Sequence, residues 1–64
     1  MTPKKTLSQR QKELQRLLLT PAGREELQEM EFRYHAVSGK LRPERMSVIT
    51  YILVHERVQG LVSS

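Results

Sequence analysis

Apolar residues recur at the spacing of an α-helix in three segments of the chain, and residues 46–58 form the most apolar segment. One wide face of the helix predicted here carries Met46, Val48, Ile49, Ile52 and Leu53. The opposite side carries a second apolar stripe, which is formed by Tyr51, Val54 and Val58. A helix with two apolar sides is expected to pack between two neighbours.

The same segment is compatible with a buried strand, because residues 48–54 are rich in β-branched and aromatic side chains. The rest of the chain offers no second strand, so an isolated strand would need a partner in another molecule. The helix is therefore the preferred interpretation. Pro43 suits its first turn and Gly60 suits the position after its end, which predicts a helix over residues 43–59.

A first helix is predicted over residues 7–19. Its start has the spacing of a capping box, either from Thr6 to Gln9 or from Ser8 to Gln11. Its apolar stripe consists of Leu7, Leu14, Leu17 and Leu18.

A second helix is predicted over residues 21–38, with Thr20 as its N-cap, Pro21 at its first position and Gly39 after its end. Its predicted buried face consists of Leu27, Met30, Tyr34 and Val37. Gly23 lies on the same line and allows a neighbouring element to approach closely.

These segments predict an all-α fold of three helices at about 7–19, 21–38 and 43–59, within a single domain over residues 6–62. Residues 1–5 are expected to form a flexible basic arm. A 64-residue chain buries only about 60% of its unfolded surface, and without cysteine it has no disulfide to stabilise it. Homo-oligomerisation, with a dimer favoured, is expected to complete the core.

Phe32 lies about 140° around the second helix from Leu27, and Ala36 follows it one turn later. This spot and the second stripe of the third helix together form the predicted interface. Its residues are Tyr51, Val54, Val58, Phe32 and Ala36. The leading hypothesis is a non-enzymatic helical interaction module that self-associates and docks or regulates a larger partner.

The net charge of +4 is spread unevenly, because residues 1–24 are strongly basic and residues 25–31 hold four glutamates. This pattern allows an alternative function, binding of nucleic acid through phosphate contacts. The candidate residues are Lys4, Lys5, Arg10, Lys12, Arg16, Arg42 and Arg45. Aromatic residues do not alternate with these cations, and the 46–58 helix is too apolar to read base edges, so this function is the second choice.

The sequence predicts no catalytic, cofactor-binding or metal-ligating residues. His35 and His55 fall on different helices, and Gln59 stands where a zinc-binding H-E-x-x-H motif needs its second histidine. The glutamates are explained by a solvated helix face. The basic start is not followed by an apolar run and no segment is long enough to span a membrane, so a cytoplasmic location is expected.

Overall fold

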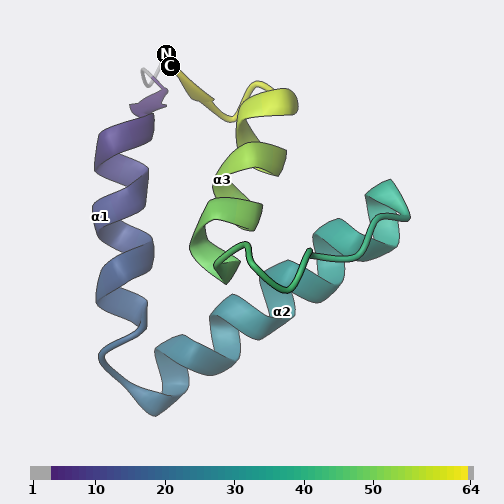
Figure 1. Cartoon of the computed structure of the whole chain (residues 1–64). Helices are drawn as coiled ribbons and strands as arrows, with labels where there is room; N and C mark the ends of the chain where they lie inside the picture. Colours follow the sequence, from purple (N-terminus) through teal and green to yellow (C-terminus); the bar gives the residue numbers. More distant parts are fainter. Residues whose placement is uncertain (1–3, 64) are drawn as a thin grey trace.

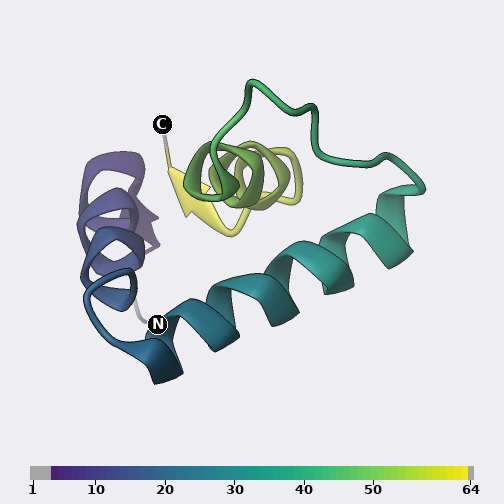
Figure 2. The same cartoon turned by 60° about the horizontal axis from the view of Figure 1, so that its bottom comes forward.

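The computed structural model describes residues 4–63, which form three helices and two very short strands. In chain order these are β1 (Lys5–Thr6), α1 (Leu7–Leu17), α2 (Pro21–Ser38), α3 (Val48–Val58) and β2 (Val62–Ser63). Helices α1 and α3 lie side by side, and both cross α2 (Figure 1). Figure 2 shows that α1 and α3 lie on the same side of α2, and each helix packs against the other two. The predicted three-helix, mostly helical fold is confirmed.

The capping box that starts α1 is formed by Thr6 and Gln9. The Gln9 backbone N–H donates to the Thr6 hydroxyl at 3.1 Å, and the Thr6 N–H donates to the Gln9 side-chain oxygen at 3.0 Å. The helix ends at Leu17, two residues before the predicted end. Here the backbone N–H groups of Leu18 and Leu19 donate to the carbonyls three residues earlier. This 3₁₀-type bonding tightens the turn that leads to α2.

Helix α2 has the predicted boundaries and the predicted caps. The Gly23 N–H donates to the Thr20 hydroxyl at 3.0 Å, and Pro21 occupies the first turn. Gly39 follows the helix with a φ angle of +72°, a left-handed conformation that glycine adopts without a Cβ clash.

Helix α3 begins at Val48, so the start predicted near Pro43 is wrong. Ser47 is the N-cap, and its hydroxyl accepts from the Thr50 N–H at 3.1 Å. Pro43 instead begins a turn in which the Met46 N–H donates to its carbonyl at 3.0 Å. At the other end Gly60 has a φ angle of +76°, and the Leu61 N–H reaches back to the Glu56 carbonyl at 2.8 Å. This is a Schellman ending, and it places Gly60 after the helix end as predicted.

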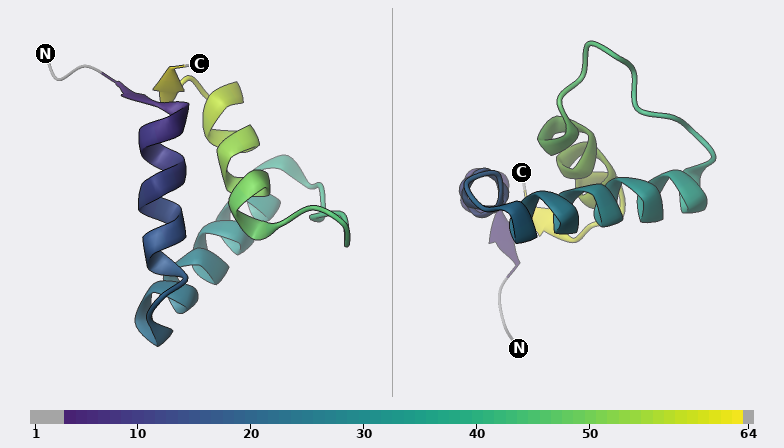
Figure 3. Two further views of the ribbon diagram at one scale, coloured as in Figure 1. Left: turned by 60° about the vertical axis from the view of Figure 1, so that its left-hand side comes forward. Right: turned by 90° about the horizontal axis from the view of Figure 1, so that it is seen from below.

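A two-residue parallel pairing joins the two ends of the described chain, with Lys5 opposite Val62 and Thr6 opposite Ser63. Figure 3 shows this pairing beside the start of α1. The sequence did not indicate it, because two residues carry no strand periodicity. Lys5 therefore belongs to β1, whereas residues 1–3 of the predicted basic arm lie outside the described residues.

The core is built around one fully buried leucine or isoleucine from each helix, namely Leu14, Leu27 and Ile52. The other buried members of the cluster are Tyr34, Ile49, Tyr51 and Leu53. The predicted core faces are thus confirmed at most positions. Val37 is an exception with 72% of its surface exposed, because the last turn of α2 extends past α3 (Figure 2). Leu18 of the predicted first stripe is a second exception, since it follows the end of α1 and is 40% exposed.

Candidate functional site

A groove opens between the last turn of α2 and the outer side of α3, where the two helices diverge (Figure 1). Its volume is about 440 Å³, and its walls are formed by Val37, Ser38, Lys40, Val54, His55, Val58 and Gln59. The exposed fractions are 72% for Val37, 45% for Val54 and 81% for Val58. Because three exposed valines surround one hollow, they form an apolar patch rather than isolated surface residues. We call this site the valine groove.

His55 fixes one wall of the valine groove. Its Nδ1 lies 3.0 Å from the Tyr51 carbonyl oxygen, which can only accept, so Nδ1–H is the donor. Its Nε2 lies 3.2 Å from the Ser38 hydroxyl, and that hydroxyl accepts from the Lys40 N–H. The imidazole also packs on the Tyr51 ring at a centroid distance of 4.3 Å. These contacts join α3 to the end of α2 along one wall of the groove.

The predicted interface is wrong at Tyr51. This side chain is only 2% exposed, and its hydroxyl donates to the Lys40 carbonyl at 2.6 Å. The segment between α2 and α3 therefore covers the part of the second stripe that contains Tyr51. Val54 and Val58 remain exposed and keep their predicted place on the surface.

Phe32 and Ala36 lie on a different surface from the two valines. Phe32 is 73% exposed and faces outward from α2, as predicted. It borders two shallow hollows, one lined also by Glu25, Glu29 and Ala36 and the other lined also by Leu41. We call these five residues the Phe32 surface. It shares no residue with the valine groove, so the five predicted interface residues do not form one site.

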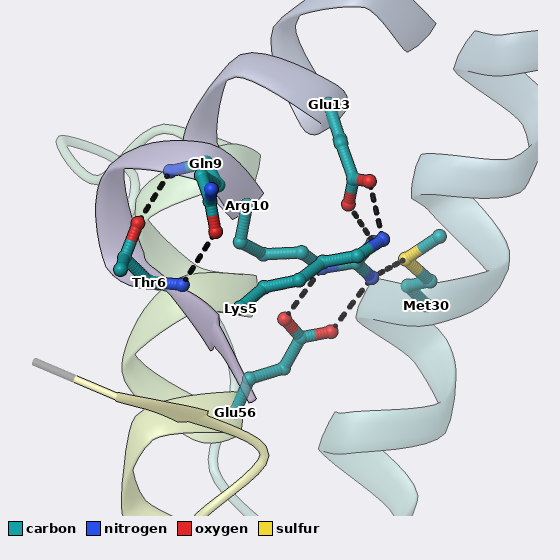
Figure 4. A network of polar contacts seen from close by, with 7 residues as sticks. All are labelled: Lys5, Thr6, Gln9, Arg10, Glu13, Met30 and Glu56. Atoms are coloured by element: carbon teal, nitrogen blue, oxygen red, sulfur yellow. Dashed lines mark hydrogen bonds and ion pairs between the residues drawn. The ribbon is translucent and has the colours of Figure 1, made fainter. Parts of the chain in front are cut away.

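A buried polar network joins the three helices on the other side of α3 (Figure 4). Glu56 is only 4% exposed, and its two carboxylate oxygens accept from Arg10 Nε at 2.8 Å and Nη2 at 2.9 Å. The Tyr34 hydroxyl donates to the same carboxylate at 3.0 Å. Arg10 also pairs with Glu13 at 3.2 Å, and Lys5 pairs with Glu13. A buried carboxylate needs such partners, so these residues maintain the fold.

The pKa values in the network follow from these contacts. Burial and the hydrogen bond to Glu56 raise the pKa of the Tyr34 phenol above its ordinary value. The hydrogen bonds from Lys5 and Arg10 lower the pKa of the Glu13 carboxyl. The hydrogen bond to Glu56 raises the pKa of the Arg10 guanidinium, which therefore stays charged.

Replacing Tyr34 with phenylalanine should lower the free energy of unfolding by about 1.5 kcal/mol at neutral pH, because a hydrogen bond to a charged group is lost. It should also change the response to alkali. In the folded protein Tyr34 keeps its proton to a higher pH than it does in the unfolded chain, where tyrosine titrates at about pH 10. The wild-type protein therefore loses this contribution as the pH rises above about 10, and Tyr34→Phe does not. Urea unfolding between pH 8 and 11 measures both effects, and equal alkaline slopes would contradict the assignment.

The residues of the nucleic-acid hypothesis do not form one patch of available cations. Arg10 is engaged by Glu56, Lys5 by Glu13, and Arg42 by Glu31 at 3.2 Å. The remaining candidates are exposed and show no ion pair with any described residue; they are Lys4, Lys12, Arg16 and Arg45. The prediction fails most clearly at Arg10, because its guanidinium belongs to the buried polar network with Glu56 and does not lie on a free helix face.

Among residues 4–63, no group of three or more histidine, aspartate or glutamate side chains is placed to hold a metal ion. Within the same range, no helix is both long enough and apolar enough to cross a membrane. Comparison with protein-family models, with curated proteins and with solved structures found no match to this chain.

The sequence analysis did not predict the polar network, although one signal for it exists in the sequence. Glu56 lies three residues after Leu53 and four after Ile52, which puts it on the core face of α3. A carboxylate at such a position requires a cation and further donors. The sequence does not indicate which of the eleven basic residues supplies the charge.

Proposed function

We propose that this protein is a non-enzymatic helical interaction module that self-associates, and docks a larger protein partner, through the valine groove. The observation that carries the proposal is the exposure of Val37, Val54 and Val58 around a single hollow, one wall of which contains His55 hydrogen-bonded to Ser38. A preformed apolar hollow with a few polar groups at its rim is the usual form of a binding site.

The energetics of a small domain favour burial of this surface. Burying a valine or leucine side chain contributes about 1.5–3 kcal/mol, whereas a chain of this length has a total stability of about 3–10 kcal/mol. A partner that binds only the folded state also shifts the folding equilibrium toward it. A partner that covers the three valines would therefore raise the free energy of unfolding by a substantial fraction of its total.

Other uses of the chain receive less support. The two groups most suited to acid–base chemistry, His55 and Glu56, are both engaged in contacts that hold helices together. Binding of nucleic acid would have to rely on the four exposed cations named above, since Lys5, Arg10 and Arg42 face carboxylates. Such scattered contacts would give weak, salt-sensitive binding.

The proposal predicts that the wild-type protein associates between low and high micromolar concentration. Val54→Glu should raise the dissociation constant roughly tenfold or more, because a charge would enter the apolar part of the groove. Circular dichroism should remain helical, since Val54 is already 45% exposed. Light scattering behind size exclusion, with the 260/280 nm absorbance ratio recorded, measures the association and detects co-purified nucleic acid.

Leu19→Glu is the matched control, because Leu19 is an exposed apolar residue at 80% that lies outside the groove. It should associate like the wild-type protein. A wild-type protein that remains monomeric at every concentration would overturn self-association. Equal loss of association in Leu19→Glu and Val54→Glu would show that the groove is not the contact surface.

A further inference from the structure

The valine groove and the Phe32 surface carry opposite charges at their edges. Lys40 forms part of the groove wall, Arg57 is exposed one turn after Val54, and the groove lining contains no carboxylate. Glu25 and Glu29 lie seven and three residues before Phe32 on the same helix, and they outnumber Arg33, the one cation that lines the same hollow. In the second hollow Glu31 and Arg42 pair with each other, so the net charge beside Phe32 is negative. Charges of opposite sign favour contact between these two surfaces, and charges of the same sign disfavour contact of the groove with itself.

The Phe32 surface also exposes apolar side chains of a size that the valine groove can hold. Phe32 is a single aromatic side chain that projects from α2 with 73% of its surface exposed, and Leu41 adds an exposed apolar side chain beside it. The groove volume of about 440 Å³ lies within the range of roughly 300–1,000 Å³ that holds a small ligand. A phenyl ring and its immediate neighbours fit within such a volume.

One molecule cannot bring its own two surfaces together. Phe32 and Val37 both belong to α2, and at 100° per residue they lie about 140° apart around the helix axis. Figure 2 shows α2 as a continuous straight helix, so no bend reduces this angle. The Phe32 surface can therefore reach a valine groove only on another copy of the chain.

From these observations we propose that the occupant of the valine groove is a second copy of this chain, which inserts Phe32 in a head-to-tail contact. The inference rests on the self-association proposed above and specifies its geometry. A two-fold dimer that pairs groove with groove would place positive edges together and leave both Phe32 surfaces uncovered. A two-fold dimer with two reciprocal contacts would need both surfaces on one face of the molecule, which their separation of about 140° around α2 opposes. A head-to-tail contact covers both apolar surfaces and leaves one free groove and one free Phe32 surface. It therefore repeats into a ring or an open chain instead of ending at the dimer favoured from the sequence.

The test uses two variants of the full chain, Phe32→Glu and Val54→Glu. Each variant lacks one half of the contact, so each alone should be monomeric at concentrations where the wild-type protein forms species larger than a dimer. An equimolar mixture should form a heterodimer and stop there, because only one intact groove and one intact Phe32 surface can meet. Native mass spectrometry with one variant ¹⁵N-labelled identifies the heterodimer, and Leu19→Glu serves as the control that assembles like the wild type.

The outcomes separate the two proposals. Heterodimers that form only in the mixture, with a dissociation constant at least roughly tenfold below that of either variant alone, support the head-to-tail contact. A wild-type dimer that persists in Phe32→Glu would overturn it while leaving self-association intact. A wild-type protein that stays monomeric would overturn both.

Discussion

Replacing Glu56 with leucine is expected to lower the free energy of unfolding by about 3 kcal/mol, which is a large part of the total for so short a chain. The substitution removes the carboxylate that accepts two hydrogen bonds from Arg10 and one from Tyr34. The guanidinium then remains in a site where the Arg10 side chain is only 23% exposed. That residual exposure lets water reach the cation, so the expected loss lies at the lower end of the range for a broken buried pair. Urea unfolding at neutral pH measures it.

A second substitution separates the cost of leaving Arg10 without Glu56 from the net contribution of the ion pair to stability. The double variant Arg10→Met with Glu56→Leu removes both charges, and it should recover most of the stability lost in Glu56→Leu. Glu13→Gln is the matched control, because Glu13 pairs with the same arginine at the exposed edge of the network and should change stability far less. Additive losses in the double variant would show that Arg10 and Glu56 do not interact energetically.

The helices could be predicted from the sequence because their signals are local. Thr20, Pro21 and Gly39 define the ends of α2 through hydrogen bonds and backbone angles that depend on neighbouring residues only. The start of α3 was misplaced because Pro43 and Ser47 both carry local signals for a helix start, and the structure uses Ser47. Pro43 suits a helix start as well as a turn, and the contact of Tyr51 with the Lys40 carbonyl holds the preceding segment outside the helix.

The candidate site was predictable only in part, because it depends on where helices diverge. Helical periodicity placed Phe32, Val54 and Val58 on outward sides, and all three are exposed. Periodicity also placed Val37 inside and Tyr51 outside, since it contains no information on how far α2 extends past α3 or on what covers Tyr51. The groove arises from both differences, because Val37 forms one wall and the covered Tyr51 supports the other through His55.

Replacing Gly23 with alanine is expected to have a similarly large effect through a steric mechanism. Gly23 is buried where α2 passes the end of α1, and a Cβ atom built there lies 2.1 Å from the Leu17 carbonyl oxygen and 2.7 Å from the carbonyl carbon. Both atoms belong to the backbone and cannot rotate away as a flexible side chain would, so the two helices have to separate. Overpacking of this kind costs about 3 kcal/mol, which exceeds the gain of about 1 kcal/mol from the better helix propensity of alanine.

Gly39→Ala distinguishes this steric effect from a general intolerance to replacement of glycine. No atom lies within 4 Å of a Cβ built at Gly39, so only its left-handed φ angle of +72° opposes alanine, at a cost of about 1–2 kcal/mol. Thermal unfolding should therefore rank the proteins as wild type, Gly39→Ala and Gly23→Ala in order of decreasing stability. Because the Gly23 contact sets the spacing of α1 and α2, its loss should also weaken the packing of Leu14 against Leu27, which amide hydrogen exchange in both helices would report. A Gly23→Ala protein as stable as the wild type would mean that α1 and α2 separate at no cost, and the close approach would then not hold the core together.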